Sequence, residues 1–185
     1  MNIKEIAAHI MDEIDAATQY TDEDTLIKVF ATIHGANRIF FHAIGRPELP
    51  MKNFAMYLKH FGYRVHVVGD VTCPAIKPGD VFFAVSGTGE TSTTLNMVKK
   101  CKEIGEIKVL LMTAAEKSSI GDLADLVLRV DCPLPGVPST VSSIQPIGGL
   151  FDECVVYALD WALRACLQER LGRRDGAGPM HSNLE

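Results

Sequence analysis

The stretch Asp80-Val-Phe-Phe-Ala-Val-Ser-Gly-Thr-Gly-Glu-Thr91 decides the fold of this chain. Its first part, residues 81–85, is an uninterrupted apolar run, which is typical of a strand buried on both faces. Two glycines and several hydroxyl residues follow, and then an apolar pattern at helical spacing, at Leu95, Val98 and Cys101. The sequence therefore predicts a buried strand that leads through a small, hydroxyl-rich turn into a helix.

The turn between this strand and helix has the features of an anion site. Gly87 and Gly89 allow the backbone to approach a ligand closely, and the free amides of the first helical turn would face it at the positive end of the helix dipole. Hydroxyl donors add to these amides, at Ser86, Thr88, Thr91 and Ser92. We expect Ser86, Gly87, Thr88, Gly89 and Thr91 to bind a phosphate. The spacing alone also fits an ordinary strand-to-helix turn capped by Ser or Thr.

Two familiar nucleotide-binding motifs do not fit this turn. A P-loop requires a Lys after its last glycine, whereas Gly89 is followed by Glu90 and Thr91. A dinucleotide-binding turn requires a third glycine, whose place is taken by Ser92. Without a Lys or ligands for Mg²⁺, the turn suits a phosphate monoester. A nucleotide-binding protein would instead have to show measurable affinity for NAD or ATP.

Composition predicts one compact domain with a substantial core. The chain has 185 residues, of which 47% are hydrophobic and 22% are charged, and this excludes a disordered protein. The formal net charge of −5 and the lack of a Lys/Arg cluster argue against nucleic acid as a partner.

The sequence contains no targeting or metal-binding motif. Residues 1–6 lack the apolar core of a signal peptide, and no apolar run approaches the length that spans a membrane. The five cysteines are unclustered and form no CxxC pair, which is typical of reduced thiols in a cytoplasmic protein. We therefore expect a cytoplasmic protein without a metal, a disulfide or a membrane contact.

Helical and strand patterns alternate along most of the chain. Two helical stripes come first, at 3–17 and 26–33, and five strand candidates follow, at 38–43, 64–68, 81–85, 108–113 and 126–130. Between the first two strands we expect a turn at 45–50 and a short helix at 54–61. A long loop at 131–145 precedes the longest helical pattern, at 147–171, and a polar tail at 172–185.

This order predicts an α/β fold, a three-layer sandwich in which a five-stranded parallel sheet carries helices on both faces. An N-terminal helical pair and a long C-terminal helix complete it. The turns at Gly45-Arg46 and at 86–91 both follow strands, and parallel sheets bind ligands at the carboxyl ends of their strands. The C-terminal helix is apolar around much of its circumference, so we expect its second side to contact another subunit of a homo-oligomer.

Several short motifs along the chain match one known family. They are the turn Ser86-Gly-Thr-Gly-Glu-Thr91, Ser118-Ser-Ile-Gly, Ala124-Asp-Leu, Gln145-Pro-Ile-Gly and the closing His181-Ser-Asn-Leu-Glu185. With the two leading helices they resemble the sugar isomerase (SIS) domains, and among them the 6-phospho-3-hexuloisomerases. The resemblance implies a single SIS domain over residues 1–185, made of leading helices (1–35), a sheet core (36–146), a C-terminal helix (147–171) and a tail (172–185).

The resemblance also implies an activity. Members of this family are cofactor-free isomerases, commonly tetramers, that convert D-arabino-hex-3-ulose 6-phosphate to fructose 6-phosphate. Such a reaction needs a base that moves a proton between neighbouring carbons through an enediol, and a group that handles the hydroxyl protons. The phosphate only anchors the substrate, so its binding energy can be used for orientation.

The resemblance places the catalytic carboxylate at Asp152, where the family has Glu. Glu153 is the second choice, because it points about 100° away on the helix. The same resemblance makes His60 the second acid/base and suggests that the tail with His181 folds over a site. An acid in the first turn of a helix, or a lone His, can equally have only a structural role.

One turn departs from the family pattern. The family usually has Gly-Ala-Gly-Arg-Ser-Gly after the first strand, but here the stretch reads Ala43-Ile-Gly-Arg-Pro-Glu48. Gly45 and Arg46 keep the pattern and are expected to contact the substrate. Pro47 removes a hydroxyl and an amide donor, and Glu48 adds a negative charge where a phosphate should lie.

This departure and the shorter acid on the C-terminal helix leave three functions open. The first is an isomerase with shifted contacts, the second an enzyme for a different phosphosugar, and the third a phosphosugar-binding module without turnover. The lack of a preceding DNA-binding segment argues against a sugar-responsive repressor.

Overall fold

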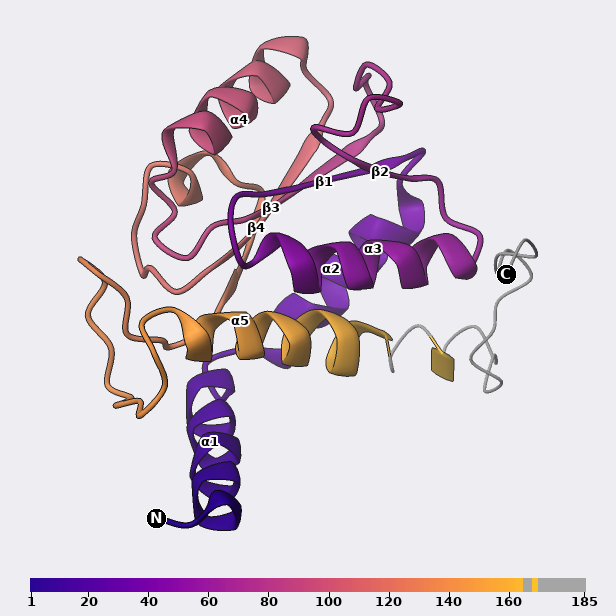
Figure 1. Cartoon of the computed structure of the whole chain (residues 1–185). Helices are drawn as coiled ribbons and strands as arrows, with labels where there is room; N and C mark the ends of the chain where they lie inside the picture. The colour runs from indigo at the N-terminus through magenta and orange to yellow at the C-terminus, as the bar shows by residue number, and fades with distance from the viewer. Residues whose placement is uncertain (165–167, 170–185) are drawn as a thin grey trace.

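The computed structural model of the protein describes residues 1–164 and 168–169 (Figure 1). The chain begins with two helices, α1 (Ile3–Thr18) and α2 (Glu23–Gly35). Strands and helices then alternate as β1 (Ile39–Ala43), α3 (Glu48–His60), β2 (Val65–Val67), β3 (Val81–Val85), α4 (Ser92–Ile104), β4 (Lys108–Thr113), a 3₁₀ turn (Gly121–Leu123) and β5 (Leu126–Arg129). After a long loop comes α5 (Gly149–Val155), which continues with π-type hydrogen bonds over Val156–Leu163.

The five strands form one parallel sheet in the order β2-β1-β3-β4-β5. β3 lies in its centre, and all of its residues are buried. β1 pairs with β3 from Ile39 opposite Val81 to Ala43 opposite Val85, so the two strands end side by side. The predicted α/β fold with a five-stranded parallel sheet is confirmed.

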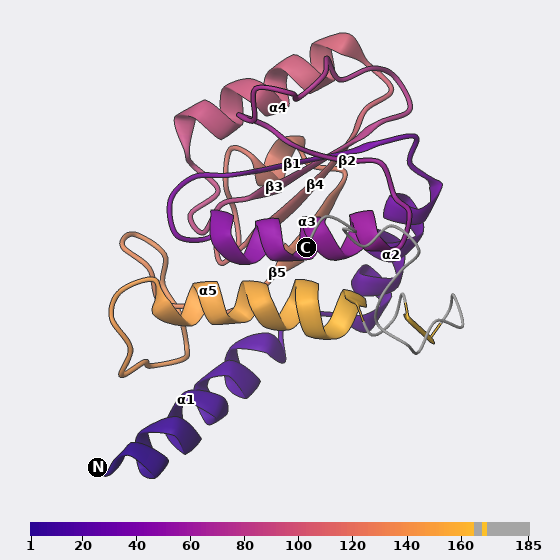
Figure 2. The same cartoon turned by 45° about the vertical axis from the view of Figure 1, so that its right-hand side comes forward.

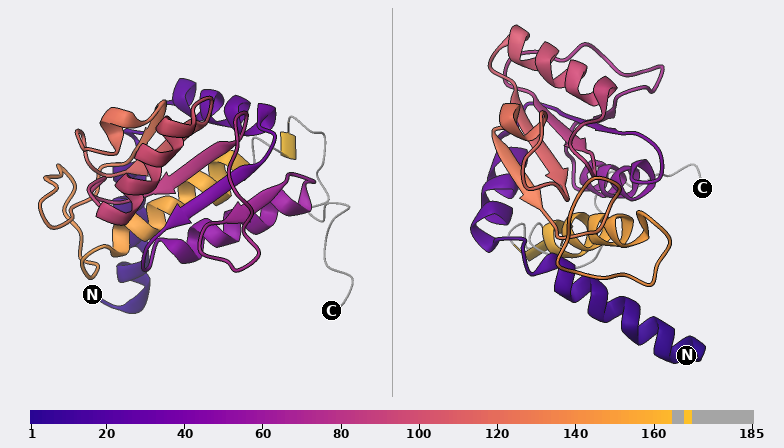
Figure 3. Two further views of the ribbon diagram at one scale, coloured as in Figure 1. Left: turned by 90° about the horizontal axis from the view of Figure 1, so that it is seen from above. Right: turned by 90° about the vertical axis from the view of Figure 1, so that its left-hand side faces the viewer.

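Each face of the sheet is covered by a different set of segments (Figure 1, Figure 2 and Figure 3). On one face, α2, α3, α5 and the last turns of α1 pack against alternate strand residues such as Phe41 and Phe83. On the other face, α4 and residues 68–76 cover Phe40 and Phe82. Because both faces are covered, the inner strands are continuous apolar runs rather than alternating ones.

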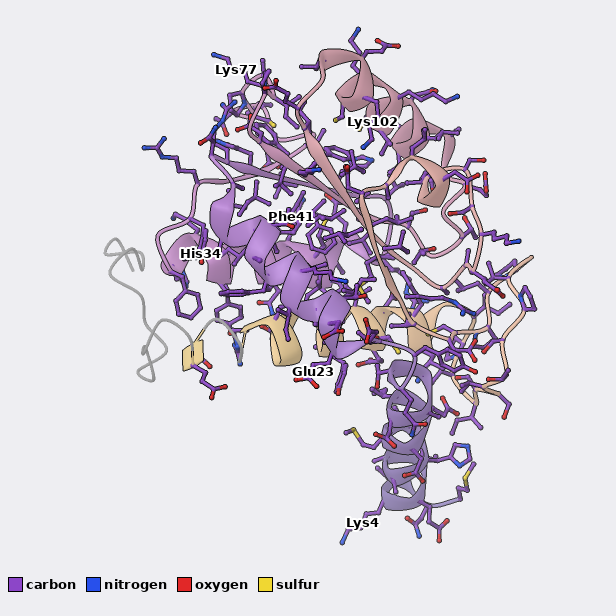
Figure 4. All side chains as sticks on the ribbon, turned by 180° about the vertical axis from the view of Figure 1, so that it is seen from behind. Lys4, Glu23, His34, Phe41, Lys77 and Lys102 are labelled. Atoms are coloured by element: carbon purple, nitrogen blue, oxygen red, sulfur yellow. The ribbon has the colours of Figure 1, made fainter. Side chains whose placement is uncertain are left out.

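α1 extends away from the body of the molecule, with Lys4 near its outer end (Figure 4). A capping box starts the helix: the Asn2 side chain accepts the amide N–H groups of Lys4 and Glu5, and the Glu5 carboxylate accepts the Asn2 N–H. Only the last turns are buried, at Glu13, Ile14, Ala17 and Thr18. The helix therefore meets the core through one end, and that end contains a buried carboxylate.

α3 begins six residues earlier than the sequence predicts. The stretch 45–50 was expected to be a turn, but the helix starts at Glu48, directly after Pro47. Pro50 lies in the first helical turn, where a backbone N–H has no partner within the helix, so the proline does not interrupt it. The predicted turn at 45–50 is therefore wrong from Glu48 onwards.

The C-terminal helix begins at Gly149 rather than at 147, because Gly148 has a positive φ of 84° that ends the preceding turn. Apolar residues on both of its sides are buried within this chain: Leu150, Phe151, Cys154, Val155, Leu159 and Leu163. The second side, which we expected to contact another subunit, is thus covered by the chain's own helices. Most of the predicted end of the helix, as well as the tail 172–185, lies outside the described residues. Within the described part, no helix is both long and apolar enough to cross a membrane.

Candidate functional site

The hydroxyl-rich loop, residues 86–91, joins the carboxyl end of β3 to the first turn of α4. Ser86 is buried, and its hydroxyl lies 2.9 Å from that of Thr91, across the loop. The Gly89 N–H donates to the Ser86 carbonyl at 3.1 Å, and the Glu90 N–H donates to the Thr88 hydroxyl at 3.2 Å. The loop is therefore a closed turn at the start of a helix, as an anion site requires.

Both glycines of the loop lie close to side chains of neighbouring segments, and Gly89 also has a backbone conformation that favours glycine. Gly89 has a φ of 64°, and a Cβ at this position would overlap the side chain of Ser118. A Cβ on Gly87 would lie 2.6 Å from Cδ1 of Leu134. The loop thus fits between two neighbouring segments, and a larger residue at either position would displace one of them.

The segment after β4 holds the loop in place. The Thr113 hydroxyl and the Ala114 N–H both donate to the Gly87 carbonyl at 3.0 Å, and the Ile120 N–H donates to the Gly89 carbonyl at 3.1 Å. The Glu90 carboxylate accepts the Ser119 N–H at 2.7 Å, and hydrogen bonds from Ser119 lower the pKa of Glu90. The sequence did not single out Thr113, although its place at the end of a predicted strand beside the loop is the signal that could have found it.

A second part of the site comes from the turn after β1 and the start of α5. The Arg46 guanidinium lies 2.7 Å from the Asp152 carboxylate and also donates to the Ile147 carbonyl at 3.2 Å. Gly45, with a φ of 79°, makes the turn that carries Arg46. The predicted residues Gly45, Arg46 and Asp152 are thus brought together from sequence positions more than a hundred residues apart.

One cavity of about 290 Å³ connects the two parts of the site. It is lined by Arg46, Pro47, Gly87, Thr88, Thr91, Leu134, Pro135, Ile147, Gly148, Phe151 and Asp152. The volume is at the small end of the range for sites that bind small molecules. Its apolar wall, Leu134 and Phe151, was not among the predicted site residues. Leu134 lies in the long loop, where no periodic pattern marks a position.

Two opposing effects act on the Asp152 carboxyl. Burial raises its pKa, and this outweighs the charge and hydrogen bond of Arg46, which lower it; the nearby Glu153 charge raises it further. The Asp152 side chain is 18% exposed, whereas Glu153 is exposed and does not line the cavity. A carboxyl group with a raised pKa is a stronger base, so the geometry favours Asp152 over Glu153 as the acid/base.

The departures at Pro47 and Glu48 are both near the cavity. Pro47 lines it and offers no N–H. Glu48 lies 2.7 Å from Lys52 on the next turn of α3, and this lysine partly balances its charge. The negative charge beside the expected phosphate position is therefore reduced rather than removed.

The structure does not bring His60 to this cavity within one chain. Glu48 begins α3 beside Pro47, and His60 is the last residue of the same helix, about 18 Å further along its axis. His60 is buried there and contacts the Tyr57 ring. His181 lies outside the described residues. Within the described part of the chain, no three His, Cys, Asp or Glu side chains are grouped so as to hold a metal ion.

Comparisons with known proteins agree with this architecture. Residues 32–143 match the family model described as SIS domain. The chain is 30% identical to 3-hexulose-6-phosphate isomerase of Bacillus subtilis (strain 168), with 100% of both chains covered. It is 32% identical to 3-hexulose-6-phosphate isomerase of Methylomonas aminofaciens, over 85% of this chain and 86% of that one. The fold is also similar to the crystal structure of a hypothetical protein from Methanococcus jannaschii, for which the function of 3-hexulose-6-phosphate isomerase was inferred. The TM-score is 0.83 at 25% identity, and the match covers 98% of this chain and 99% of that one.

Proposed function

We propose that this chain, which belongs to the SIS domain family, is an isomerase that interconverts D-arabino-hex-3-ulose 6-phosphate and fructose 6-phosphate. One observation carries the proposal: a single cavity is bordered both by the hydroxyl-rich loop, at Thr88 and Thr91, and by the Asp152 carboxylate. Relatives named 3-hexulose-6-phosphate isomerase support the substrate class.

In this proposal the loop binds the phosphate and Asp152 moves the proton. Amides and hydroxyls of residues 86–91 hold the phosphate, so the sugar extends across the cavity towards α5. The Asp152 carboxylate takes the proton from C3 of fructose 6-phosphate, an enediol forms over C2 and C3, and the proton returns to C2 while the carbonyl forms at C3. Arg46 lies close enough to Asp152 to stabilise the negative charge that develops on the enediol oxygen.

The hydroxyl protons need a second acid/base, and we propose that His60 of another copy supplies it. His60 lies about 18 Å along α3 from the end that borders the cavity, so this role requires a neighbouring copy. Because His60 is buried within its own chain, it also requires that the contact between copies uncovers the end of α3. The exposed side of α1 offers a surface for such a contact, since Ile3 is 85% and Met11 is 50% exposed. The proposed assembly is a cytoplasmic homotetramer, in which the tail with His181 folds over a site.

A second candidate function is a module that binds a phosphosugar without turning it over, or an isomerase of another sugar phosphate. Pro47 favours these alternatives, because it lines the cavity and cannot donate a hydrogen bond to a sugar or a phosphate.

Deuterium exchange distinguishes these functions. The proposed enediol predicts that wild-type protein in D₂O places deuterium on C3 of fructose 6-phosphate, as followed by proton NMR. Asp152→Asn should abolish the exchange, while the thermal stabilisation by fructose 6-phosphate survives. Thermal stabilisation without exchange in the wild type would favour the binding module. Fructose without phosphate is the control ligand, and an equal stabilisation by it would contradict the phosphate site.

A further inference from the structure

Among the described residues, Glu13 is one of three buried carboxylates, with Asp80 and Asp131, that have no role in the proposed mechanism. Glu13 lies in α1, far in sequence from the residues that line the cavity, and it is only 4% exposed. Its carboxylate accepts hydrogen bonds from the Ser143 hydroxyl at 2.6 Å, from the Ile144 N–H at 2.7 Å and from the Gln145 side-chain amide at 3.3 Å. Three consecutive residues of the loop before α5 are thus bound to one side chain.

The Glu13 carboxylate is ionised more easily than an ordinary glutamate, and in this form it binds the loop strongly. Burial by itself raises the pKa of Glu13, but the hydrogen bonds from Ser143, Ile144 and Gln145, together with the nearby His9, bring it below its ordinary value. Hydrogen bonds to an ionised acceptor are about twice as strong as those between neutral groups. Glu13 therefore fixes residues 143–145 more firmly than a neutral side chain would.

The bound loop leads directly to the proposed catalytic acid. The Gln145 side chain packs against Gly149, so closely that a Cβ on Gly149 would lie 3.1 Å from it. The Gly149 N–H donates to the Pro146 carbonyl at 2.8 Å, and the Asp152 N–H donates to the Gly148 carbonyl at 3.2 Å. The position of the first turn of α5, and with it that of Asp152, depends on the segment that Glu13 holds.

A second set of contacts ties the same loop to the end of α1. The Asp131 N–H donates to the Ala17 carbonyl at 2.9 Å, and the Asp131 carboxylate accepts the Thr140 N–H at 3.1 Å. The Tyr20 and Thr140 hydroxyls lie 3.3 Å apart. Because the middle of the loop is fixed in this way, loss of Glu13 should release residues 143–145 without unfolding the whole loop.

We propose that Glu13 is a positioning residue for the reaction: from α1, it holds residues 143–145 so that α5 presents Asp152 to the cavity. This inference rests on the proposed function, because it assumes that Asp152 is the base. Glu13 itself does not touch the cavity. Its effect should therefore appear in turnover rather than in phosphate binding, since the loop 86–91 is held by other contacts.

The test compares Glu13→Ala with Asp12→Ala, a matched control that removes the same charge from an exposed neighbour on α1. Glu13→Ala should lower kcat for fructose 6-phosphate by about tenfold to a hundredfold, because a shift of about 1 Å in a reacting group can have an effect of that size. KM and the affinity for inorganic phosphate should change much less. Glu13→Gln, which keeps one acceptor oxygen for the Ile144 N–H, should recover part of the loss.

Hydrogen exchange measured by NMR supplies a readout that does not need activity. In Glu13→Ala, the amides of Ile144 and Gln145 and those of residues 149–152 should exchange faster than in the wild type and in Asp12→Ala. Unchanged exchange at 149–152 would overturn the inference, and so would an unchanged kcat in folded Glu13→Ala. If the wild type has no turnover at all, the proposed function fails, while the exchange result still decides whether Glu13 orders the start of α5.

Discussion

Gly89→Ala tests whether the hydroxyl-rich loop is built as the structure describes. Gly89 has a φ of 64°, and this left-handed conformation costs about 1–2 kcal/mol for a residue with a Cβ. The new Cβ would also overlap the side chain of Ser118, which is buried, and overpacking of this kind costs about 1–3 kcal/mol. The two effects together predict a loss of about 2–5 kcal/mol in the free energy of unfolding.

Thermal and urea denaturation measure this loss. For a chain of this size, each kcal/mol lowers Tm by about 2–4 °C, so Gly89→Ala should lower Tm by about 4–20 °C. Gly62→Ala is the matched control: Gly62 also has a positive φ, of 93°, but a Cβ there would meet nothing within 4 Å. It should therefore lose only the backbone contribution of about 1–2 kcal/mol.

The contact with Ser118 can be tested separately. Ser118→Gly removes the overlapping side chain together with its hydrogen bond from the Gly121 N–H, which is 3.1 Å long and contributes about 1 kcal/mol. In the Gly89→Ala background it should recover stability, although alone it destabilises the protein. Equal losses in Gly89→Ala and Gly62→Ala, with no recovery by Ser118→Gly, would refute the argument that this loop is packed against Ser118.

Three further predictions concern charges. Arg46→Gln removes the group that lowers the pKa of Asp152, so the carboxyl should lose its proton at a higher pH. The acid limb of the pH profile of kcat/KM should therefore move to higher pH. A shift to lower pH would contradict Asp152 as the base. Glu48→Gln removes a negative charge near the cavity. It should tighten binding of fructose 6-phosphate by about twofold to fivefold in calorimetry, since a partly exposed charge contributes up to about 1 kcal/mol. Weaker binding would show that Glu48 contacts the sugar. Asp80→Ala leaves the Arg38 guanidinium without its buried partner. Urea denaturation should show a free energy of unfolding lower by about 3–5 kcal/mol. A loss below about 1 kcal/mol would mean that water replaces the carboxylate.

The fold could be predicted because its signals are local. The apolar run at 81–85 and the glycines after it depend on neighbouring residues alone, and the structure has the strand and the turn where the sequence places them. The C-terminal helix, which has apolar residues on two sides, was harder to interpret. Its pattern gives the extent of apolar surface but not what covers it, and here the cover comes from the same chain.

The site could be predicted only in part, because its contacts join distant segments. Arg46 and Asp152 were each expected in it, but their ion pair could not be derived from spacing. The burial of Glu13 could not be predicted for the same reason. A single acid in an amphipathic helix usually faces water, and nothing near Glu13 in the sequence indicates its partners at 143–145. His60 was placed by family resemblance, which does not say whether a residue acts in its own chain.

The two halves of the cavity are held by different parts of the chain, and this separates affinity from turnover. The hydroxyl-rich loop is fixed by the segment after β4, through Thr113 and Ile120. The start of α5 is fixed by Arg46 and, through the loop before it, by Glu13. Because these two sets of hydrogen bonds involve different residues, effects in the two halves should add when substitutions are combined. We therefore expect Gly89→Ala to act mainly on phosphate binding, Glu13→Ala mainly on kcat, and the double variant to show the product of the two losses.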